Sequence, residues 1–175
     1  MNSFTTALIK RRSIRKFKLE QIQEDELQDI LNAGLHAMNA ANFQYTKFIV
    51  VQNSELSKKL SVLNLKMLMK GDFDPYHNAP TIVLIMSKID YPCAKEDGAL
   101  AAGNMANAAF AMGIGSCWIH RENEMFENED GKELLKQFGV EEELQGVGAL
   151  VLGYPDEEKK PSDRYNPDRI HRERW

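Results

Sequence analysis

Hydrophobic and polar residues follow two periods along the chain, and the shorter period predicts strands. Mainly apolar or β-branched runs at residues 46–52, 81–87, 116–120 and 147–155 predict four core strands. The run at 81–87, TIVLIMS, has almost no polar position. Such a run is typical of a strand buried on both faces, in the middle layer of a helix–sheet–helix sandwich.

The longer period, with apolar residues three or four positions apart, predicts five helices. A short first helix starts at a cap on Ser3 or Thr5 and ends at Ile9. The longer helices cover residues 22–38, 54–68 (capped by Ser54), 96–112 and 130–138. The helix at 96–112 is rich in Ala and Gly and nearly uncharged beyond its start, so it is predicted to be the central helix, packed on nearly every side.

No repeat, low-complexity tract or Ser/Gly linker divides the sequence, which predicts one domain over residues 1–175. The tail, residues 156–175, is polar and interrupted by Pro161 and Pro167. It has no apolar pattern from which to build a core, but it carries the aromatic residues Tyr165 and Trp175. We expect it to wrap across a partner subunit.

Composition narrows the class of protein. The 26 acidic residues outnumber the 22 Lys and Arg residues, giving a net charge of −4, which argues against a general nucleic-acid binder. Cys93 and Cys117 lack metal-ligand spacing and are predicted to be free thiols of an intracellular protein. No secretion signal or apolar run of about twenty residues is present, so we expect a cytoplasmic protein with no membrane span.

Positive charge is nevertheless concentrated in KRRSIRKFK, residues 10–18. Arg11, Arg12, Ser13 and Arg15 combine guanidinium groups with a hydroxyl, which suits multidentate contact with phosphate oxygens. In an extended segment Arg11, Ser13 and Arg15 share one face. These residues alone leave two readings open, a phosphate site and a solvated charged turn.

Other candidate chemistry finds no support. In GIGS, residues 113–116, the glycines follow a helix and precede a strand, the reverse of the dinucleotide-binding order, so they predict a turn. The four histidines show no metal-binding spacing: His36, His77, His120 and His171. No nucleophile elbow is present, and neither cysteine has a neighbouring base.

Five segments in order resemble motifs of the FMN-dependent nitroreductase family, along almost the whole chain: RRSIRKF, NAANFQYTKFIVV, YHNAPTIVLI, DGALAAGNMANAAFAMGIGSCWI and VGALVLGYP. The second segment is similar to the signature PSxxNxQPWxFxVV and retains Asn42, Gln44 and Phe48. The resemblance implies an α+β fold with three helix–sheet–helix layers, a central mostly antiparallel sheet, an extended C-terminal arm and an intertwined homodimer.

The resemblance also implies an FMN site shared by two subunits. The phosphate and ribityl chain would be held by Arg11, Arg12, Ser13 and Arg15, with Arg15 reaching toward the ring and Lys160 or Arg164 added from the tail. The other protomer would contribute Met38, Asn39, Ala40, Asn42 and Gln44. The strand end Trp118, Ile119 and His120 would pass backbone N–H groups near flavin N5 and O4. Asn64 and Lys66 match, more loosely, a family loop at the pyrimidine edge.

The implied activity is two-electron, ping-pong transfer from NAD(P)H to nitroaromatics, quinones or similar small acceptors. The cofactor carries this chemistry, which fits the absence of a catalytic triad. The sequence departs from the family at Met38-Asn39, Tyr45-Thr46 and His120, which changes the pocket wall and leaves the acceptor open. Three alternatives remain: flavin fragmentation or dehalogenation in the same fold, a non-catalytic flavin-binding redox sensor, and an anion-binding structural module without flavin.

Overall fold

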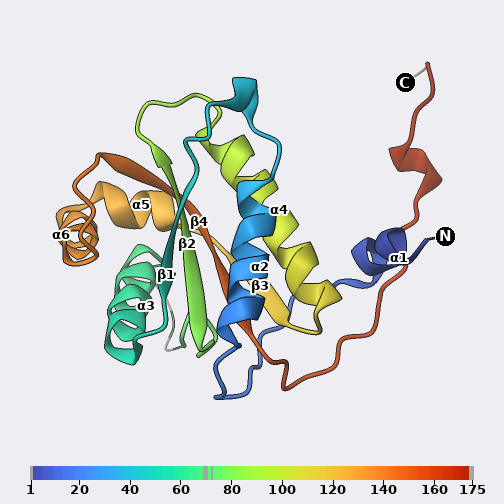
Figure 1. The fold of residues 1–175 in the computed structure, drawn as a ribbon, viewed down its shortest axis with the longest axis horizontal. Coiled ribbons are helices and arrows are strands. Elements are labelled where there is room, and N and C mark those ends of the chain that lie inside the picture. Colours follow the sequence, from blue (N-terminus) through green and yellow to red (C-terminus); the bar gives the residue numbers. More distant parts are fainter. Residues whose placement is uncertain (1, 69–70, 72, 174–175) are drawn as a thin grey trace.

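The computed structural model of the protein describes residues 2–68, 71 and 73–173. Within this part, four strands form one antiparallel sheet in the order β1-β2-β4-β3 (Figure 1). The strands are β1 (Lys47–Val51), β2 (Thr81–Lys88), β3 (Gly115–Ile119) and β4 (Leu144–Gly153). The four predicted strands and the antiparallel sheet are confirmed, with ends that differ by at most three residues.

Helices cover both faces of the sheet, which confirms the three-layer prediction (Figure 1). One face carries α2 (Glu24–Leu35) and α4 (Ala94–Ala111), and α1 (Ser3–Lys10) contacts α4. The other face carries α3 (Ser54–Leu68), α5 (Glu122–Glu127) and α6 (Glu129–Gln137). Two 3-10 helices are short, η1 (Ala40–Asn42) and η2 (Pro167–Arg169).

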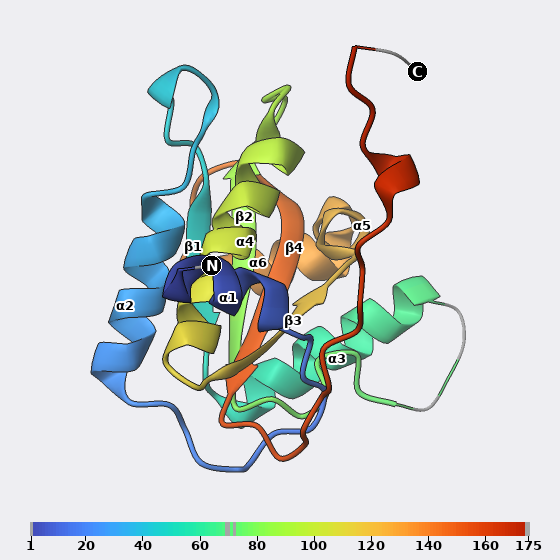
Figure 2. The same cartoon turned by 90° about the vertical axis from the view of Figure 1, so that its right-hand side faces the viewer.

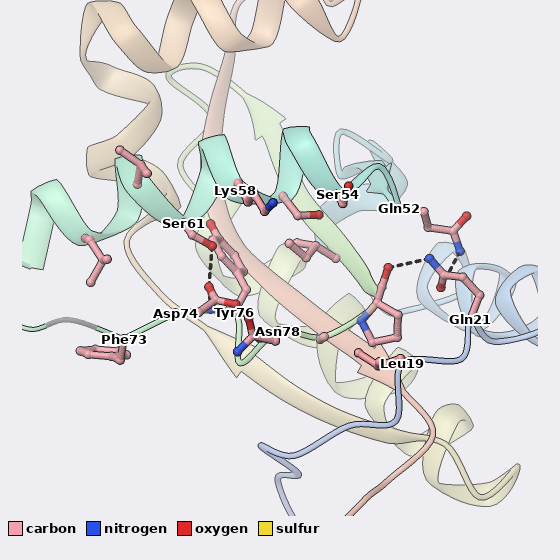
Figure 3. A pocket seen from close by; sticks show the side chains of 16 residues that line it. Leu19, Gln21, Gln52, Ser54, Lys58, Ser61, Phe73, Asp74, Tyr76 and Asn78 are labelled. Carbon is pink, nitrogen blue, oxygen red and sulfur yellow. Dashed lines mark hydrogen bonds between the residues drawn. The ribbon is translucent and has the colours of Figure 1, made fainter.

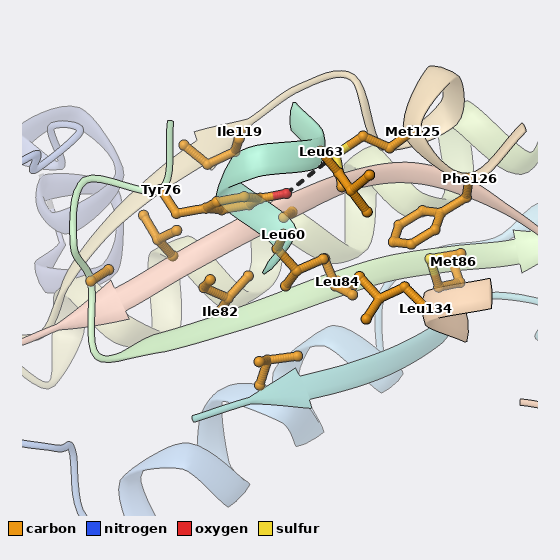
Figure 4. Packing of buried hydrophobic residues seen from close by; sticks show 14 of the residues in the cluster. Leu60, Leu63, Tyr76, Ile82, Leu84, Met86, Ile119, Met125, Phe126 and Leu134 are labelled. Atoms are coloured by element: carbon orange, nitrogen blue, oxygen red, sulfur yellow. Dashed lines mark hydrogen bonds between the residues drawn. The ribbon is translucent and has the colours of Figure 1, made fainter. Parts of the chain in front are cut away.

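Strand β2 divides the core. All residues from Thr81 to Ser87 are buried, as predicted for a strand covered on both faces. Ile82, Leu84 and Met86 join the cluster beneath α3 and α5 (Figure 4), whereas the intervening Val83 and Ile85 join the cluster beneath α2 and α4. Burying each such side chain is worth about 1.5–3 kcal/mol, so this strand holds the three layers together.

Several helix ends differ from the predictions, and at the starts of α1 and α3 a neighbouring asparagine side chain caps the helix. Asn2, and not Ser3 or Thr5, caps α1 by accepting from the Thr5 amide at 2.8 Å. Asn53, and not Ser54, accepts from the first free amides of α3. Helix α2 ends at Leu35 and not Met38. The short α5 was not predicted, since its six residues are too few to show a helical period.

Helix α4 is less enclosed than predicted. Its inner face is buried against the sheet and α2, but Leu100 is 42 % exposed and Gly103 and Asn104 are exposed beside it. Helix α1 and the tail also stand out from this side of the domain (Figures 1 and 2). Tyr165 of the tail is exposed, and Trp175 lies outside the described residues. In the described chain no helix is both long and apolar enough to cross a membrane.

Candidate functional site

The basic segment is extended, as predicted, and is fixed to the sheet. The Ile14 amide donates to the Ser116 carbonyl at 2.9 Å, and the Lys18 amide donates to the Tyr154 carbonyl at 2.9 Å. Ser13 forms a parallel bridge with Ser116. The segment therefore sits on a rigid scaffold beside β3. The Ser13 hydroxyl interacts with the thiol of Cys117, whose pKa is raised by burial and which is free, as is Cys93.

Three guanidinium groups from the two ends of the chain meet at this segment. Burial lowers the pKa of Arg11, and the positive charges of Arg164 and Arg12 lower it further. Arg164 is therefore a basic tail residue whose charge acts on Arg11. The site combines desolvation of a positive charge with repulsion between like charges, and a bound anion would reduce both unfavourable effects.

Arg12 has a structural role within this cluster. Its Nη1 donates to the carbonyls of Ile9 at 2.7 Å and Arg11 at 2.6 Å, and its Nη2 donates to the Ser162 carbonyl at 3.0 Å. The last bond spans 150 residues and ties the tail to the basic segment. Arg12 thus positions the residues around Arg164, while its Nε is buried without a partner.

A cavity of about 190 Å³ opens at the cluster, between the basic segment, the turn into β3 and the start of the tail. Its lining includes Arg11, Arg12 and Gly115. A Cβ on Gly115 would lie 3.0 Å from the Ile14 side chain, so glycine permits this close approach. The lining also contains Glu157, a residue that the sequence did not indicate.

Glu157 anchors the segment at Arg15. Its Oε1 accepts from the Arg15 amide at 2.6 Å, and its Oε2 pairs with Lys159 at 2.8 Å. Lys159 and, after it, the Arg15 amide lower the pKa of this carboxyl. Arg15 itself is exposed, as is Lys160. The fixed backbone leaves the Arg15 side chain able to extend toward a ligand.

The three site residues predicted at the end of β3 differ in how exposed they are to solvent. Trp118 is 37 % exposed and lies across Gly148, where an added Cβ would overlap the indole ring. Ile119 is buried, whereas His120 is exposed. The His120 carbonyl accepts from Asn64 Nδ2 at 3.0 Å.

Asn64 and Lys66, the residues of the looser match, lie outside the basic cluster in this chain. Asn64 is completely buried and is hydrogen-bonded to the backbone at the end of β3. Lys66 forms an ion pair with Asp130 at 2.7 Å. Neither is one of the residues that line the cavity at the basic cluster.

Residues 38–44 form a strained loop at the other end of the molecule, where η1 lies at the top of Figure 1. Ala41, Asn42 and Gln44 have φ angles of 49°, 57° and 56°, which non-glycine residues rarely adopt. The Gln44 amide donates to Asn39 Oδ1 at 3.1 Å, and Gln44 Nε2 donates to Asn42 Oδ1 at 2.9 Å. Strain held by such bracing is common at ligand sites.

Asp97, which the sequence indicated only as an acid near a helix start, fixes this loop. It is buried in α4, its Oδ1 accepts from the Ala40 amide at 3.1 Å, and its Oδ2 accepts from the Tyr91 hydroxyl at 2.7 Å. The Tyr91 ring packs edge-on against Phe43 and Tyr45. The loop is thus held on both sides of η1.

A second cavity, of about 510 Å³, lies beside the loop and is lined by Met38, Asn39, Asn42 and Gln44, with Asp97 and Thr46. It shares no lining residue with the cavity at the basic cluster. The predicted site residues therefore form two separate groups in one chain: the basic segment with Arg164, and the loop at 38–44.

Comparisons with known proteins identify the family. The model of the nitroreductase family matches residues 8–154. A protein of Archaeoglobus fulgidus named "Putative NADH dehydrogenase/NAD(P)H nitroreductase" is 36 % identical over 174 residues, covering 94 % of each chain. An iodotyrosine deiodinase of Thermotoga neapolitana is 26 % identical over 169 residues, covering 86 % of this chain and 87 % of that one. This chain belongs to the nitroreductase family.

Solved structures agree with this assignment. A nitroreductase with bound FMN from Bacteroides fragilis has a TM-score of 0.86 and 27 % identity, covering 95 % of both chains. An FMN-dependent nitroreductase from Clostridium difficile has a TM-score of 0.83 and 30 % identity, covering 97 % of this chain and 98 % of that one. The nitroreductase fold expected from the resemblance is confirmed.

Proposed function

We propose that the protein is an FMN-dependent NAD(P)H oxidoreductase that reduces nitroaromatics, quinones or similar acceptors by two electrons in a ping-pong route. Family membership and the FMN-bound relative from Bacteroides fragilis support this proposal. The observation that carries it is the cluster of Arg11, Arg12 and Arg164, in which burial and, after it, the positive charges of Arg164 and Arg12 lower the pKa of Arg11. Beside the Ser13 hydroxyl, such a cluster fits a phosphate group.

The residues of this chain hold and orient the cofactor in this proposal. Arg11, Ser13 and Arg164 bind the phosphate, while Arg12 keeps the tail in place through Ser162. Arg15, whose backbone is fixed by Glu157, extends toward the ring. Bound FMN would supply two-electron transfer between a nicotinamide and an acceptor. The β3 end from Trp118 to His120 would offer backbone N–H groups to the ring.

A second subunit is needed to complete this site. Met38, Asn39, Ala40, Asn42 and Gln44 lie away from the basic cluster in one chain, so the proposal assigns them to the flavin of the partner. The side of the domain with α1, α2 and α4 exposes several large apolar side chains: Phe4, Leu8, Ile9, Leu35, Met38 and Leu100. An apolar surface of this kind marks a protein interface. We propose that residues 1–175 form one domain that pairs here, with the tail across the partner.

Flavin reduction tests the activity. We expect the purified protein to be yellow, and NADH or NADPH to bleach its visible flavin absorption under anaerobic conditions, because the nicotinamide reduces bound FMN. Addition of a quinone or a nitroaromatic then restores the colour. A protein that stays colourless after incubation with FMN contradicts the flavoprotein proposal. A yellow protein that neither nucleotide bleaches contradicts the NAD(P)H oxidoreductase proposal and leaves the flavin-binding sensor as an alternative.

The similarity to an iodotyrosine deiodinase supports a second candidate, reductive dehalogenation. An experiment on the protein reduced anaerobically with dithionite distinguishes dehalogenation from reduction of quinones or nitroaromatics. Iodide release from iodotyrosine together with failure to reoxidise with quinones or nitroaromatics would favour dehalogenation. Reoxidation by those acceptors without iodide release favours the first proposal.

Replacing Leu100 with glutamate tests the dimer. We expect the wild type to sediment as a dimer and Leu100→Glu to sediment as a monomer with reduced FMN occupancy, because the substitution would bury a charge in the interface. Leu19→Glu is the matched control, since Leu19 is 92 % exposed and lies at a cleft beside α3 (Figure 3). A wild-type monomer with full FMN occupancy would contradict the shared site.

A further inference from the structure

Three polar side chains are buried together behind the end of β3. Asn64 of α3, Tyr76 of the loop before β2 and Glu122 of α5 are each 1 % exposed or less. The Tyr76 hydroxyl donates to Glu122 Oε1 at 3.0 Å and also interacts with the Asn64 side chain. Asn64 Nδ2 donates to the His120 carbonyl at 3.0 Å. A chain of polar contacts thus links a buried carboxyl group to the backbone at the strand end.

The network is held rigidly from several sides. Asp74 Oδ1 accepts from the Tyr76 amide at 3.0 Å and from the Ser61 hydroxyl (Figure 3). The Tyr76 ring packs in the apolar cluster of α3 and α5, and its hydroxyl lies 3.6 Å from Met125 Sδ (Figure 4). Strand β4 passes so close that a Cβ on Gly146 would overlap the backbone of Glu122. These contacts leave little room for the network to rearrange.

The network anchors a strained peptide. Arg121, directly after the strand end, has a φ of 87°. A non-glycine residue in this region costs about 1–3 kcal/mol and persists only where its surroundings enforce it. The His120 carbonyl, which belongs to the same peptide group as the Arg121 N–H, points to Asn64. Because a trans peptide is planar, fixing this carbonyl directs the Arg121 N–H away from the network.

Two buried atoms of the network have no hydrogen-bond partner among the described residues, Asn64 Oδ1 and Glu122 Oε2. A buried acceptor without a donor is costly, and a proton on Glu122 turns one carboxyl oxygen into a donor. Burial raises the pKa of Glu122 to about 7. The neighbouring charges act in opposite directions, since Glu124 raises this pKa and Arg121 lowers it. Burial raises the pKa of Tyr76 most, and the charges of Glu122 and then Asp74 raise it further. The Tyr76 hydroxyl therefore keeps its proton and remains a hydrogen-bond donor.

We propose that Asn64, Tyr76 and Glu122 are positioning residues that hold the His120–Arg121 peptide against the bound flavin, and that a proton on Glu122 is part of this support. The proposal rests on the proposed function for the place of the flavin. The buried contacts that carry it are properties of this chain alone.

A coupling between Glu122 and the flavin follows from this arrangement. Reduction adds negative charge to the flavin, and a negative charge on Glu122 opposes it. The reduction potential of the bound flavin should therefore fall more steeply with pH where Glu122 loses its proton. By reciprocity, reduction of the flavin favours the protonated carboxyl. An uncharged glutamine at this position removes the coupling while keeping a donor.

The experiment measures the midpoint potential of bound FMN from pH 5.5 to 8.5 in the wild type, Glu122→Gln and Glu127→Gln. We expect an additional pH-dependent decline near pH 7 in the wild type and in Glu127→Gln, an exposed acid on the same helix. This decline should be lost in Glu122→Gln. Identical pH profiles in all three proteins would overturn the proposal.

A second measurement needs no flavin. In FMN-free protein, amide hydrogen exchange at residues 120–123, corrected for the intrinsic effect of pH, should speed up several-fold between pH 6 and 8 in the wild type but not in Glu122→Gln. Tyr76→Phe should exchange fast at both pH values, because it breaks the link to Asn64. Unchanged exchange in all variants would refute the positioning role. A protein that shows the expected exchange but binds no FMN would refute only the proposed function.

Discussion

Replacing Arg11 and Arg164 together with alanine is expected to weaken FMN binding by a factor on the order of 10²–10⁴. A hydrogen bond to a charged group contributes about 1.5–3 kcal/mol, and about 1.4 kcal/mol corresponds to a tenfold change in affinity. Arg11 is partly desolvated and is repelled by the positive charge of Arg164, and a bound anion would offset both unfavourable effects. Titration of FMN-free protein with FMN at fixed ionic strength, followed by flavin fluorescence, measures the change.

The matched control removes two charges from the same segment without touching the cluster. Lys16→Ala with Lys18→Ala affects exposed lysines that do not line the cavity and is expected to change FMN affinity by less than about threefold, because exposed charges are screened by solvent and salt. A double arginine variant that is folded and binds FMN as tightly as this control would show that the segment does not hold the phosphate. The single variants Arg164→Ala and Lys160→Ala then measure the contribution of each tail residue to FMN affinity. We expect the larger loss of affinity in Arg164→Ala.

Replacing Glu122 with glutamine is expected to change how stability depends on pH. The pKa of Glu122 is about 7 in the folded protein and 4.5 as an ordinary glutamate. The folded state therefore keeps a proton that the unfolded state loses, so the free energy of unfolding falls as pH rises from 4.5 to 7 and is level above that window. The whole decline amounts to about 3 kcal/mol. Glu122→Gln lacks this decline and becomes more stable relative to the wild type across the window.

Urea unfolding of the FMN-free proteins at pH 5, 6, 7 and 8 measures this difference. Glu127→Gln on the same helix should follow the wild type at each pH, since Glu127 is exposed. If the difference between the wild type and Glu122→Gln stays constant from pH 5 to pH 8, the carboxyl does not hold its proton in the folded state.

Much of the fold was predictable from local patterns. The run at 81–87 predicted a strand covered on both faces because it offers no polar side to water, and every one of its residues is buried. Gly113 was predicted to end a helix, and it has a φ of 79° directly after α4. The nitroreductase fold and family also followed from segments that keep their order and spacing along the chain.

Errors arose where a distant residue decides a local feature. Helix α2 stops before Met38, and the loop that follows is held by Asp97, which lies far along the chain. Helix α4 is rich in Ala and Gly and nearly uncharged beyond its start, which predicted packing on nearly every side, yet the face with Leu100 is open in one chain. The composition of a helix indicates that an apolar face favours burial, but it does not indicate whether the same chain or a partner chain buries that face.

The sequence alone determined the elements, the extended basic segment and the family, because these depend on side-chain periods and on residues close together in the chain. The tertiary structure decided that Arg164 joins Arg11, that residues 38–44 stay apart from them, and that Asn64, Tyr76 and Glu122 meet behind β3. Each of these relations joins residues far apart in sequence. Such contacts arise only when the layers pack, so no local pattern along the chain encodes them.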